Sequence, residues 1–150
     1  MARRRSSAPK VFDKILNRLN QIDLNRPAEE MFDKLIPEIE DYNVEQLNKG
    51  IKSDGNRIKP EYRPKTVIIK QKKGQPTDRV TLKDYGDFHN QIRVKKYATK
   101  FELVSYDEKS EKLQEKYTPD ILGITNENLA KIRLEIFNKL QKDVKRIFKV

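Results

Sequence analysis

Apolar residues recur at helical spacing in three segments of the chain. The first segment runs from Val11 to Ile22, the second from Met31 to Leu47, and the third from Leu129 to Ile147. Side chains at positions i, i+3, i+4 and i+7 lie on one face of a helix, so each segment predicts an amphipathic helix with one buried stripe.

Residues that start and stop helices border these segments. Asn25 is placed to cap the second helix, and Thr125 the third, because short polar side chains accept hydrogen bonds from the first backbone N–H groups. Pro27 suits the first turn of the second helix, whereas Pro37 should kink or split that helix. Gly50 suits its C-terminal stop.

Between the helical segments, the pattern changes to that of loops and strands. Turn-forming residues dominate residues 51–65, which predicts a long loop. The β-branched run at residues 66–70 and the extended chemistry of residues 79–82 predict strands on either side of an exposed basic loop tip. Residues 92–94 and 101–105 alternate apolar and polar positions, which predicts an antiparallel hairpin with one buried face. The expected total is three or four strands.

The order of these elements predicts an α+β fold. After the hairpin, Asp107 can cap a short helix that ends at Tyr117, before the long final helix. We expect a small antiparallel sheet packed by N-terminal and long C-terminal helices. Residues 1–10 lack apolar periodicity and predict a flexible basic arm, residues 11–150 form a single domain, and an extended basic loop region covers about 51–79.

Composition limits the chemistry that this chain can perform. Of 150 residues, 35% are hydrophobic and 37% are charged, and there is no Cys and one His. These counts exclude disulfides and thiolate metal sites, and they leave little for metal or general-base chemistry. No stretch approaches the roughly 20 apolar residues of a membrane span, and no apolar run follows the N-terminal arginines. We therefore expect a soluble, unexported protein with no membrane contact.

The net charge of +10 is distributed in alternating blocks. Residues 21–50 hold three basic and eight acidic side chains, a net charge of −5, and residues 51–80 hold nine basic and three acidic ones, a net charge of +6. A basic patch is typical of nucleic-acid binding, whereas alternating blocks suit head-to-tail contact between identical copies. A solvated mixed surface explains the same pattern equally well.

Three groups of residues resemble catalytic or phosphate-binding sites. Residues 72–75 contain a basic Gly segment but lack the second Gly and the Lys-Ser/Thr ending of a phosphate-binding loop. His89 follows Asp84 and Asp87 without a Cys nucleophile or a second His, so it is expected to be structural or exposed. The neighbouring glutamates of the second helix suit a solvated face better than a glycosidase site. We expect no enzymatic activity, no cofactor and no metal.

Basic side chains gather at two further places. In the predicted hairpin they alternate with aromatic residues that could stack on bases, although a plain amphipathic hairpin explains them as well; these residues are Arg93, Lys95, Lys96, Tyr97, Lys100 and Phe101. In the arm, Arg3, Arg4 and Arg5 could bind a phosphate backbone or an acidic protein groove. The sequence does not decide between these two partners.

The central part of the chain resembles a known family. The stretches are GIKSDG at residues 50–55, PEYRPKT at 60–66, KGQPTDRVTLKDYGDF at 73–88, SYDEK at 105–109 and ILGIT at 121–125. Together they resemble the small neck or tail-completion proteins of tailed bacteriophages, particularly those of crAss-like phages and other phages of Bacteroides relatives. The resemblance covers about residues 50–130.

This resemblance implies a structural virion protein. It implies an α+β subunit that forms a ring of six or twelve identical copies at the head-to-tail junction, made in the host cytoplasm, that connects the portal to the tail and allows genome passage. The implied partners are further copies of this chain, the portal and other neck or tail proteins, with contact to genomic DNA left open. Because a head-to-tail ring needs two complementary surfaces, acidic residues 21–50 and basic residues 51–80 are candidates for them. The alternative function is a small basic nucleic-acid-binding protein.

Two sets of residues are the candidate sites of this protein. Subunit or partner contacts are expected at Arg3, Arg4, Arg5, Lys70, Lys72, Lys73, Gly74, Gln75 and Arg79. The family-like turn comprises Thr81, Leu82, Asp84, Gly86, Asp87 and Phe88. The Lys70–Arg79 segment is expected to lack contacts within one copy and to become ordered against another subunit.

Overall fold

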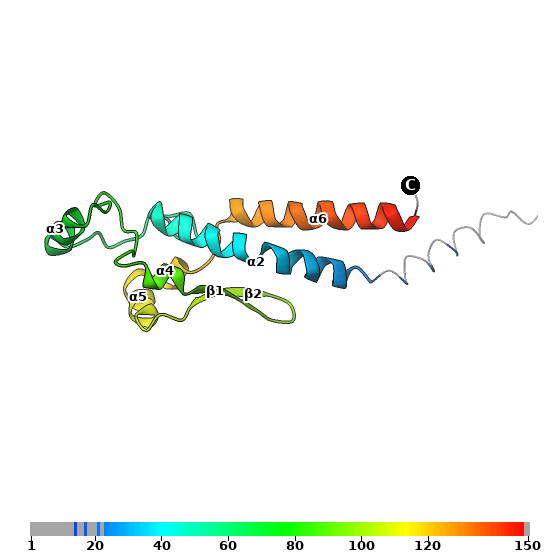
Figure 1. Ribbon diagram of the computed structural model, residues 1–150, viewed down its shortest axis with the longest axis horizontal. Helices are drawn as coiled ribbons and strands as arrows, with labels where there is room; N and C mark the ends of the chain where they lie inside the picture. The colour runs from blue at the N-terminus through cyan, green and yellow to red at the C-terminus, as the bar shows by residue number, and fades with distance from the viewer. Residues whose placement is uncertain (1–13, 15–16, 18–20, 22, 149–150) are drawn as a thin grey trace, which may run out of the picture. The chain divides into compact units, whose positions relative to one another are not determined.

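A computed structural model describes residues 14, 17, 21 and 23–148 of the chain (Figure 1). By their internal contacts, these residues divide into two compact units. The central unit is Lys34–Glu135, and the terminal unit takes in the described residues before and after it in the sequence. The predicted helix over residues 11–22 and the predicted arm over residues 1–10 lie outside the described residues, apart from three isolated positions.

The described residues form helices and one hairpin in an α+β arrangement. In chain order the elements are α2 (Asn25–Asn48), α3 (Pro64–Lys72), α4 (Asp87–Asn90), β1 (Ile92–Lys96), β2 (Phe101–Ser105), α5 (Ser110–Tyr117), a 3-10 turn (Pro119–Ile121) and α6 (Asn126–Phe148). The predicted fold class, an antiparallel sheet with long N-terminal and C-terminal helices, is confirmed in this form. Within the described residues, however, the sheet has two strands rather than three or four.

Helix α2 supplies one wall of the core of the central unit. Leu35, Ile39 and Leu47 are buried on one stripe of this helix, at the spacing the sequence predicts. Pro37 lies inside α2, which continues through it from Asn25 to Asn48, so the predicted split does not occur. The helix ends before Gly50, whose φ of +72° suits a residue without a Cβ.

Two buried polar side chains join α2 to the segment that precedes α6. The Asn43 amide donates hydrogen bonds to the carbonyl oxygens of Ile121 and Gly123, both at 3.0 Å. Gln46 Oε1 accepts a hydrogen bond of 3.0 Å from the Thr125 backbone N–H. Thr125 also caps α6 as predicted, since its Oγ1 accepts from the Asn128 N–H at 3.4 Å. These bonds satisfy backbone groups that burial would otherwise leave unpaired.

The predicted antiparallel hairpin is confirmed. Strand β1 pairs with β2 in the register that sets Ile92 opposite Ser105 and Val94 opposite Leu103. Ile92 and Leu103 are buried and most of their neighbours along the strands are not, so the hairpin has one buried face. Glu40 of α2 accepts a hydrogen bond of 3.0 Å from the Val94 backbone N–H, which fixes β1 against the helix.

The strand predicted at residues 66–70 is wrong, because these residues lie in α3. Pro64 occupies the first turn of the helix, and the N–H groups of Thr66 and Val67 donate to the Arg63 carbonyl at 2.8 and 3.1 Å. A proline in the first turn favours a helix, and β-branched residues favour a strand only where a neighbouring strand is available to pair with them. The predicted loop of 51–79 therefore contains a helix.

The strand predicted at residues 79–82 is also absent from the described structure. The backbone N–H groups of Thr81 and Leu82 donate to the Tyr62 hydroxyl, at 2.9 and 3.2 Å, instead of to another strand. This side-chain acceptor satisfies both backbone N–H groups without a sheet. Helix α5 ends at Tyr117 as predicted, but the predicted Asp107 cap is wrong. The helix begins at Ser110 without a side-chain cap, and Asp107 Oδ1 instead accepts from the Lys109 N–H at 2.8 Å in the preceding turn.

Candidate interaction surface

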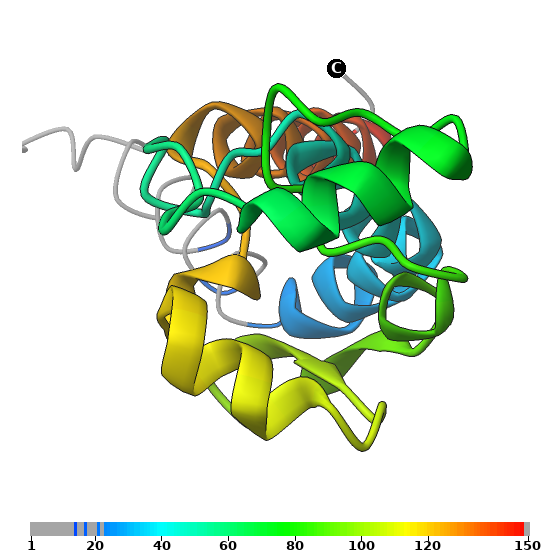
Figure 2. The same cartoon turned by 90° about the vertical axis from the view of Figure 1, so that its left-hand side faces the viewer.

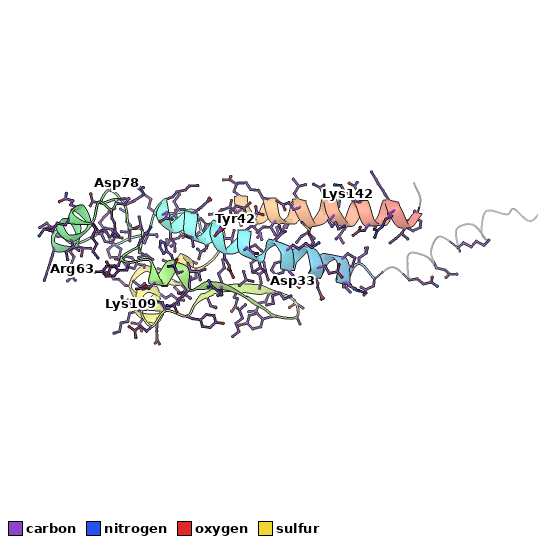
Figure 3. The ribbon with its side chains drawn as sticks, in the orientation of Figure 1. Asp33, Tyr42, Arg63, Asp78, Lys109 and Lys142 are labelled. Atoms are coloured by element: carbon purple, nitrogen blue, oxygen red, sulfur yellow. The ribbon has the colours of Figure 1, made fainter. Side chains whose placement is uncertain are left out.

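A cleft in the central unit lies between α3, the segment of residues 82–88 and α5. Its volume is about 320 Å³, and its lining includes Tyr62, Ile69, Leu82, Tyr85, Leu113 and Tyr117. Figure 2 shows α3 (green) and α5 (yellow) as separate helices in the central unit. Arg63, directly before α3, and Lys109, directly before α5, are labelled in Figure 3. The lining combines aromatic and aliphatic side chains with lysines and with the carboxylates of Asp84, Asp87 and Asp107.

Lys70 is an internal anchor of this region rather than a contact residue. It is only 6% exposed, and its Nζ donates to the Lys83 carbonyl at 2.6 Å and to Gln75 Oε1 at 3.1 Å. The same ammonium group lies 4.8 Å from the centroid of the Tyr62 ring. Because this ammonium group is bonded within its own copy, the contacts of Lys70 do not support the predicted partner contact at this position.

The loop after α3 is likewise held within the subunit. Gln75 Nε2 donates to the Asp84 carbonyl at 2.7 Å, and Lys73 forms an ion pair with the Asp84 carboxylate. This ion pair raises the pKa of Lys73, whose Nζ also lies 3.9 Å from the Tyr85 ring centroid. Arg79 Nε donates to the Asn48 carbonyl at 2.8 Å. The expectation that residues 70–79 lack internal contacts is therefore wrong, because their side chains bond to residues distant in the sequence.

The remaining predicted contact residues divide into two groups. Lys72 and Gly74 are exposed, and Gly74 has a φ of +63° with no atom within 4 Å of the place where a Cβ would be. These two positions remain open to a partner. Arg3, Arg4 and Arg5 lie outside the described residues.

The family-like turn residues lie together along the cleft. Thr81 and Phe88 are buried, and Leu82, Asp84 and Asp87 line the cleft. Gly86 has a φ of +101° directly before α4, which explains why glycine occupies this position. Leu82 has a φ of +54°, a conformation that non-glycine residues rarely adopt, and the hydrogen bond from its N–H to Tyr62 helps to hold it.

His89 is structural. It is 5% exposed, and its Nε2 lies 2.8 Å from the Thr81 carbonyl oxygen. Because a carbonyl can only accept a hydrogen bond, Nε2 carries the proton. Burial lowers the pKa of His89 below its usual value of 6.5, with a smaller opposing effect from the hydrogen bond.

Helix α5 has a basic side and an acidic side. Lys109, Leu113 and Lys116 line the cleft shared with α3. On the other side, Glu108, Glu111 and Glu115 line a second, shallower cleft of about 760 Å³, together with Thr118 and Pro119. No lysine or arginine lines this second cleft within the described part of the chain. The sequence shows these acids only as part of a charge-rich segment, since their common side depends on the helix.

The basic residues of the hairpin are partly neutralised by a neighbour. Lys100 Nζ donates to Glu102 Oε1 at 2.6 Å, and the Tyr97 hydroxyl donates to Glu102 Oε2 at 3.1 Å. These bonds lower the pKa of Glu102, so its carboxylate stays charged. The Nζ atoms of Lys95 and Lys100 lie 5.4 and 5.1 Å from the Tyr97 ring centroid. The ring that could stack on a base is thus already in contact with two lysines.

Several large apolar side chains of the central unit are exposed. Ile68 and Ile69 of α3 are 53% and 45% exposed, and Tyr85 at the edge of the cleft is 77% exposed. The sequence prediction missed Ile68 and Ile69 as surface residues, because a strand pattern placed them in the sheet. The Pro64 start and the lysines at the end of α3 were the signals for a helix.

Two kinds of feature are absent from the described residues. No helix among them is long and apolar enough to cross a membrane. In the same residues, no group of three or more His, Asp or Glu side chains is arranged to hold a metal ion.

Comparison with protein-family models, curated proteins and solved structures finds no significant match to this chain. The resemblance to phage neck proteins therefore stays a prediction.

Proposed function

We propose that this protein is a structural subunit of a homo-oligomeric ring in the neck of a tailed bacteriophage, where it joins portal to tail and leaves a passage for the genome. Its place is then the virion, and it acts by contact rather than by catalysis. The proposal combines the resemblance of residues 50–130 with a surface that is suited to contact between proteins.

The exposed apolar side chains of the central unit carry this proposal. Ile68, Ile69 and Tyr85 are each at least 45% exposed, although isoleucine is among the residue types that folded chains most often bury. Exposed apolar side chains that gather in one region, with charged groups around them, are typical of protein–protein contacts. Here Lys65, Lys72 and Lys73 surround Ile68 and Ile69 on α3 and its following turn.

The oligomeric state of the purified chain tests this proposal directly. Native mass spectrometry at increasing protein concentration should give one closed assembly, with about six or twelve copies, rather than a continuous series of sizes. In purified particles, quantitative mass spectrometry against the major capsid protein should give the same copy number. A chain that stays monomeric at high concentration and is absent from particles would overturn the proposal.

The effect of salt separates the ring from the alternative of nucleic-acid binding. Binding to DNA through lysines should weaken steeply with salt, because bound phosphates release counterions. An assembly with an apolar centre should persist when salt is raised to about 0.5 M. The described hairpin gives this alternative little support, because Lys100 and Tyr97 already donate hydrogen bonds to Glu102.

A further inference from the structure

We propose that the exposed face of α3 in one copy docks against the acidic side of α5 in the next copy, and that this contact repeats around the ring. The inference rests on the proposed function, because it names the surfaces by which the copies join. Both surfaces belong to the central unit.

The face of α3 has an apolar centre between two positive charges. Lys65, Ile68, Ile69 and Lys72 stand at positions i, i+3, i+4 and i+7 and are all exposed, so they share one side of the helix. The two lysines are about 10 Å apart along the helix axis, given the rise of 1.5 Å per residue. Neither forms an ion pair with another described residue.

The acidic side of α5 is the matching surface. Glu111 and Glu115 lie one turn apart on α5, Glu108 precedes the helix, and all three are exposed. They line the second cleft without an ion-pair partner among the described residues, although the whole chain has a net charge of +10. Thr118 and Pro119 at the end of α5 give this cleft an edge with aliphatic surface, where Ile68 of the neighbouring copy can pack.

The two surfaces meet between copies rather than within one copy. The side of α5 that shares a cleft with its own α3 carries Lys109 and Lys116, and the glutamates line the other cleft. Lys65 and Lys72, which have no ion-pair partner among the described residues of their own copy, can therefore pair with these glutamates on a different molecule. A contact between two different surfaces of identical copies repeats head to tail, and it closes into a ring when its rotation divides a full circle.

Charge reversal tests this pairing with two variants. The first is Lys65→Glu with Lys72→Glu, and the second is Glu111→Lys with Glu115→Lys. All four side chains are exposed, so each variant should keep the melting temperature of the subunit to within a few degrees. Each variant alone places like charges opposite each other. We expect the concentration needed for assembly to rise at least tenfold in each.

Mixing the two variants should restore the ring. Each copy of the first variant then meets only complementary surfaces on copies of the second, so the two must alternate. Native mass spectrometry should show assemblies that contain equal numbers of both variants. A control variant, Lys142→Glu with Lys145→Glu, carries the same net charge as the first variant but changes exposed lysines of α6, and it should assemble like the natural chain.

The outcomes distinguish this inference from the proposed function. Assembly of the natural chain that both charge reversals leave unchanged would overturn the docking of α3 on α5 and leave the ring intact. Loss of assembly in each variant without recovery in the mixture would overturn it too, because the charges would then not act on each other. A natural chain that never assembles would overturn the ring itself.

Discussion

The buried lysine of α3 gives the sharpest test of the structure. Replacing Lys70 with Met keeps the length of the side chain and its aliphatic contacts but removes the ammonium group. That group donates to the Lys83 carbonyl at 2.6 Å and to Gln75 at 3.1 Å, and it lies over the Tyr62 ring. The change therefore removes the link between α3, its following loop and the segment of residues 81–85.

The loss of stability follows from the number of these contacts. A hydrogen bond to a charged group contributes about 1.5–3 kcal/mol, and a partly desolvated cation–π contact about 1 kcal/mol. Burying a methionine instead of a lysine recovers part of this, since the ammonium group no longer has to be removed from water. We expect Lys70→Met to lower the free energy of unfolding by about 2–3 kcal/mol, a large share of the roughly 5–15 kcal/mol that holds a domain together.

Urea unfolding followed by circular dichroism measures this loss. Lys72→Met is a matched control, because Lys72 is exposed on the same helix two residues away, and it should change the free energy of unfolding by no more than about 0.5 kcal/mol. In the ring assay the ranking of the two variants reverses. Lys72→Met should weaken assembly more than Lys70→Met, because Lys72 belongs to the proposed contact between copies. Equal and small stability losses in both variants would refute the internal role of Lys70.

Three further predictions concern buried groups and glycines. His89→Gln should flatten the pH dependence of stability. Burial lowers the pKa of His89 in the folded chain, so below about pH 6.5 the unfolded chain binds a proton that the folded chain does not, and the natural chain should lose free energy of unfolding as the pH falls from 7.5 to 5. Equal losses in both proteins would contradict this. Gly50→Ala should destabilise the chain by more than Gly74→Ala. Both glycines have positive φ, but a Cβ on Gly50 would lie 2.9 Å from Arg79 Cβ, whereas Gly74 has open space. Thermal melts that rank the two variants the other way would show that Arg79 moves aside for the added methyl group. Asn43→Leu should cost about 2–4 kcal/mol in urea unfolding, since it removes two buried hydrogen bonds to backbone carbonyls; an unchanged midpoint would mean that these carbonyls find other donors.

Local signals in the sequence sufficed for several elements. Thr125 marks the start of α6, Gly50 the end of α2 and Tyr117 the end of α5. The alternation at residues 92–94 and 101–105 predicts the hairpin, because a strand with one buried face repeats every two residues. Each of these features depends on residues close together in the chain, so the sequence alone contains the information.

The candidate surfaces could be predicted only in part. The sequence indicated the basic character of residues 70–79 but not which side chains stay exposed. Lys70 and Lys72 are two residues apart and read alike, yet a helix turns them about 200° away from each other, so one is buried against Tyr62 and the other faces solvent. That distinction depends on whether the segment is a helix or a strand. Its β-branched residues favour a strand, so the sequence pattern indicated the wrong period.

By itself, the sequence determined the amphipathic character of α2 and α6, the Thr125 cap of α6, the hairpin and the alternation of charge, because hydrophobic period, capping chemistry and charge are properties of neighbouring residues. Only the tertiary structure decided that residues 64–72 are a helix, that Asn43 and Gln46 hold the segment before α6, and that Glu111 and Glu115 of α5 line one cleft while Lys116 lines another. These features depend on groups up to about 80 residues apart, such as Asn43 and Gly123. Whether a polar side chain is an anchor or a contact surface is decided by the partner that the fold brings to it.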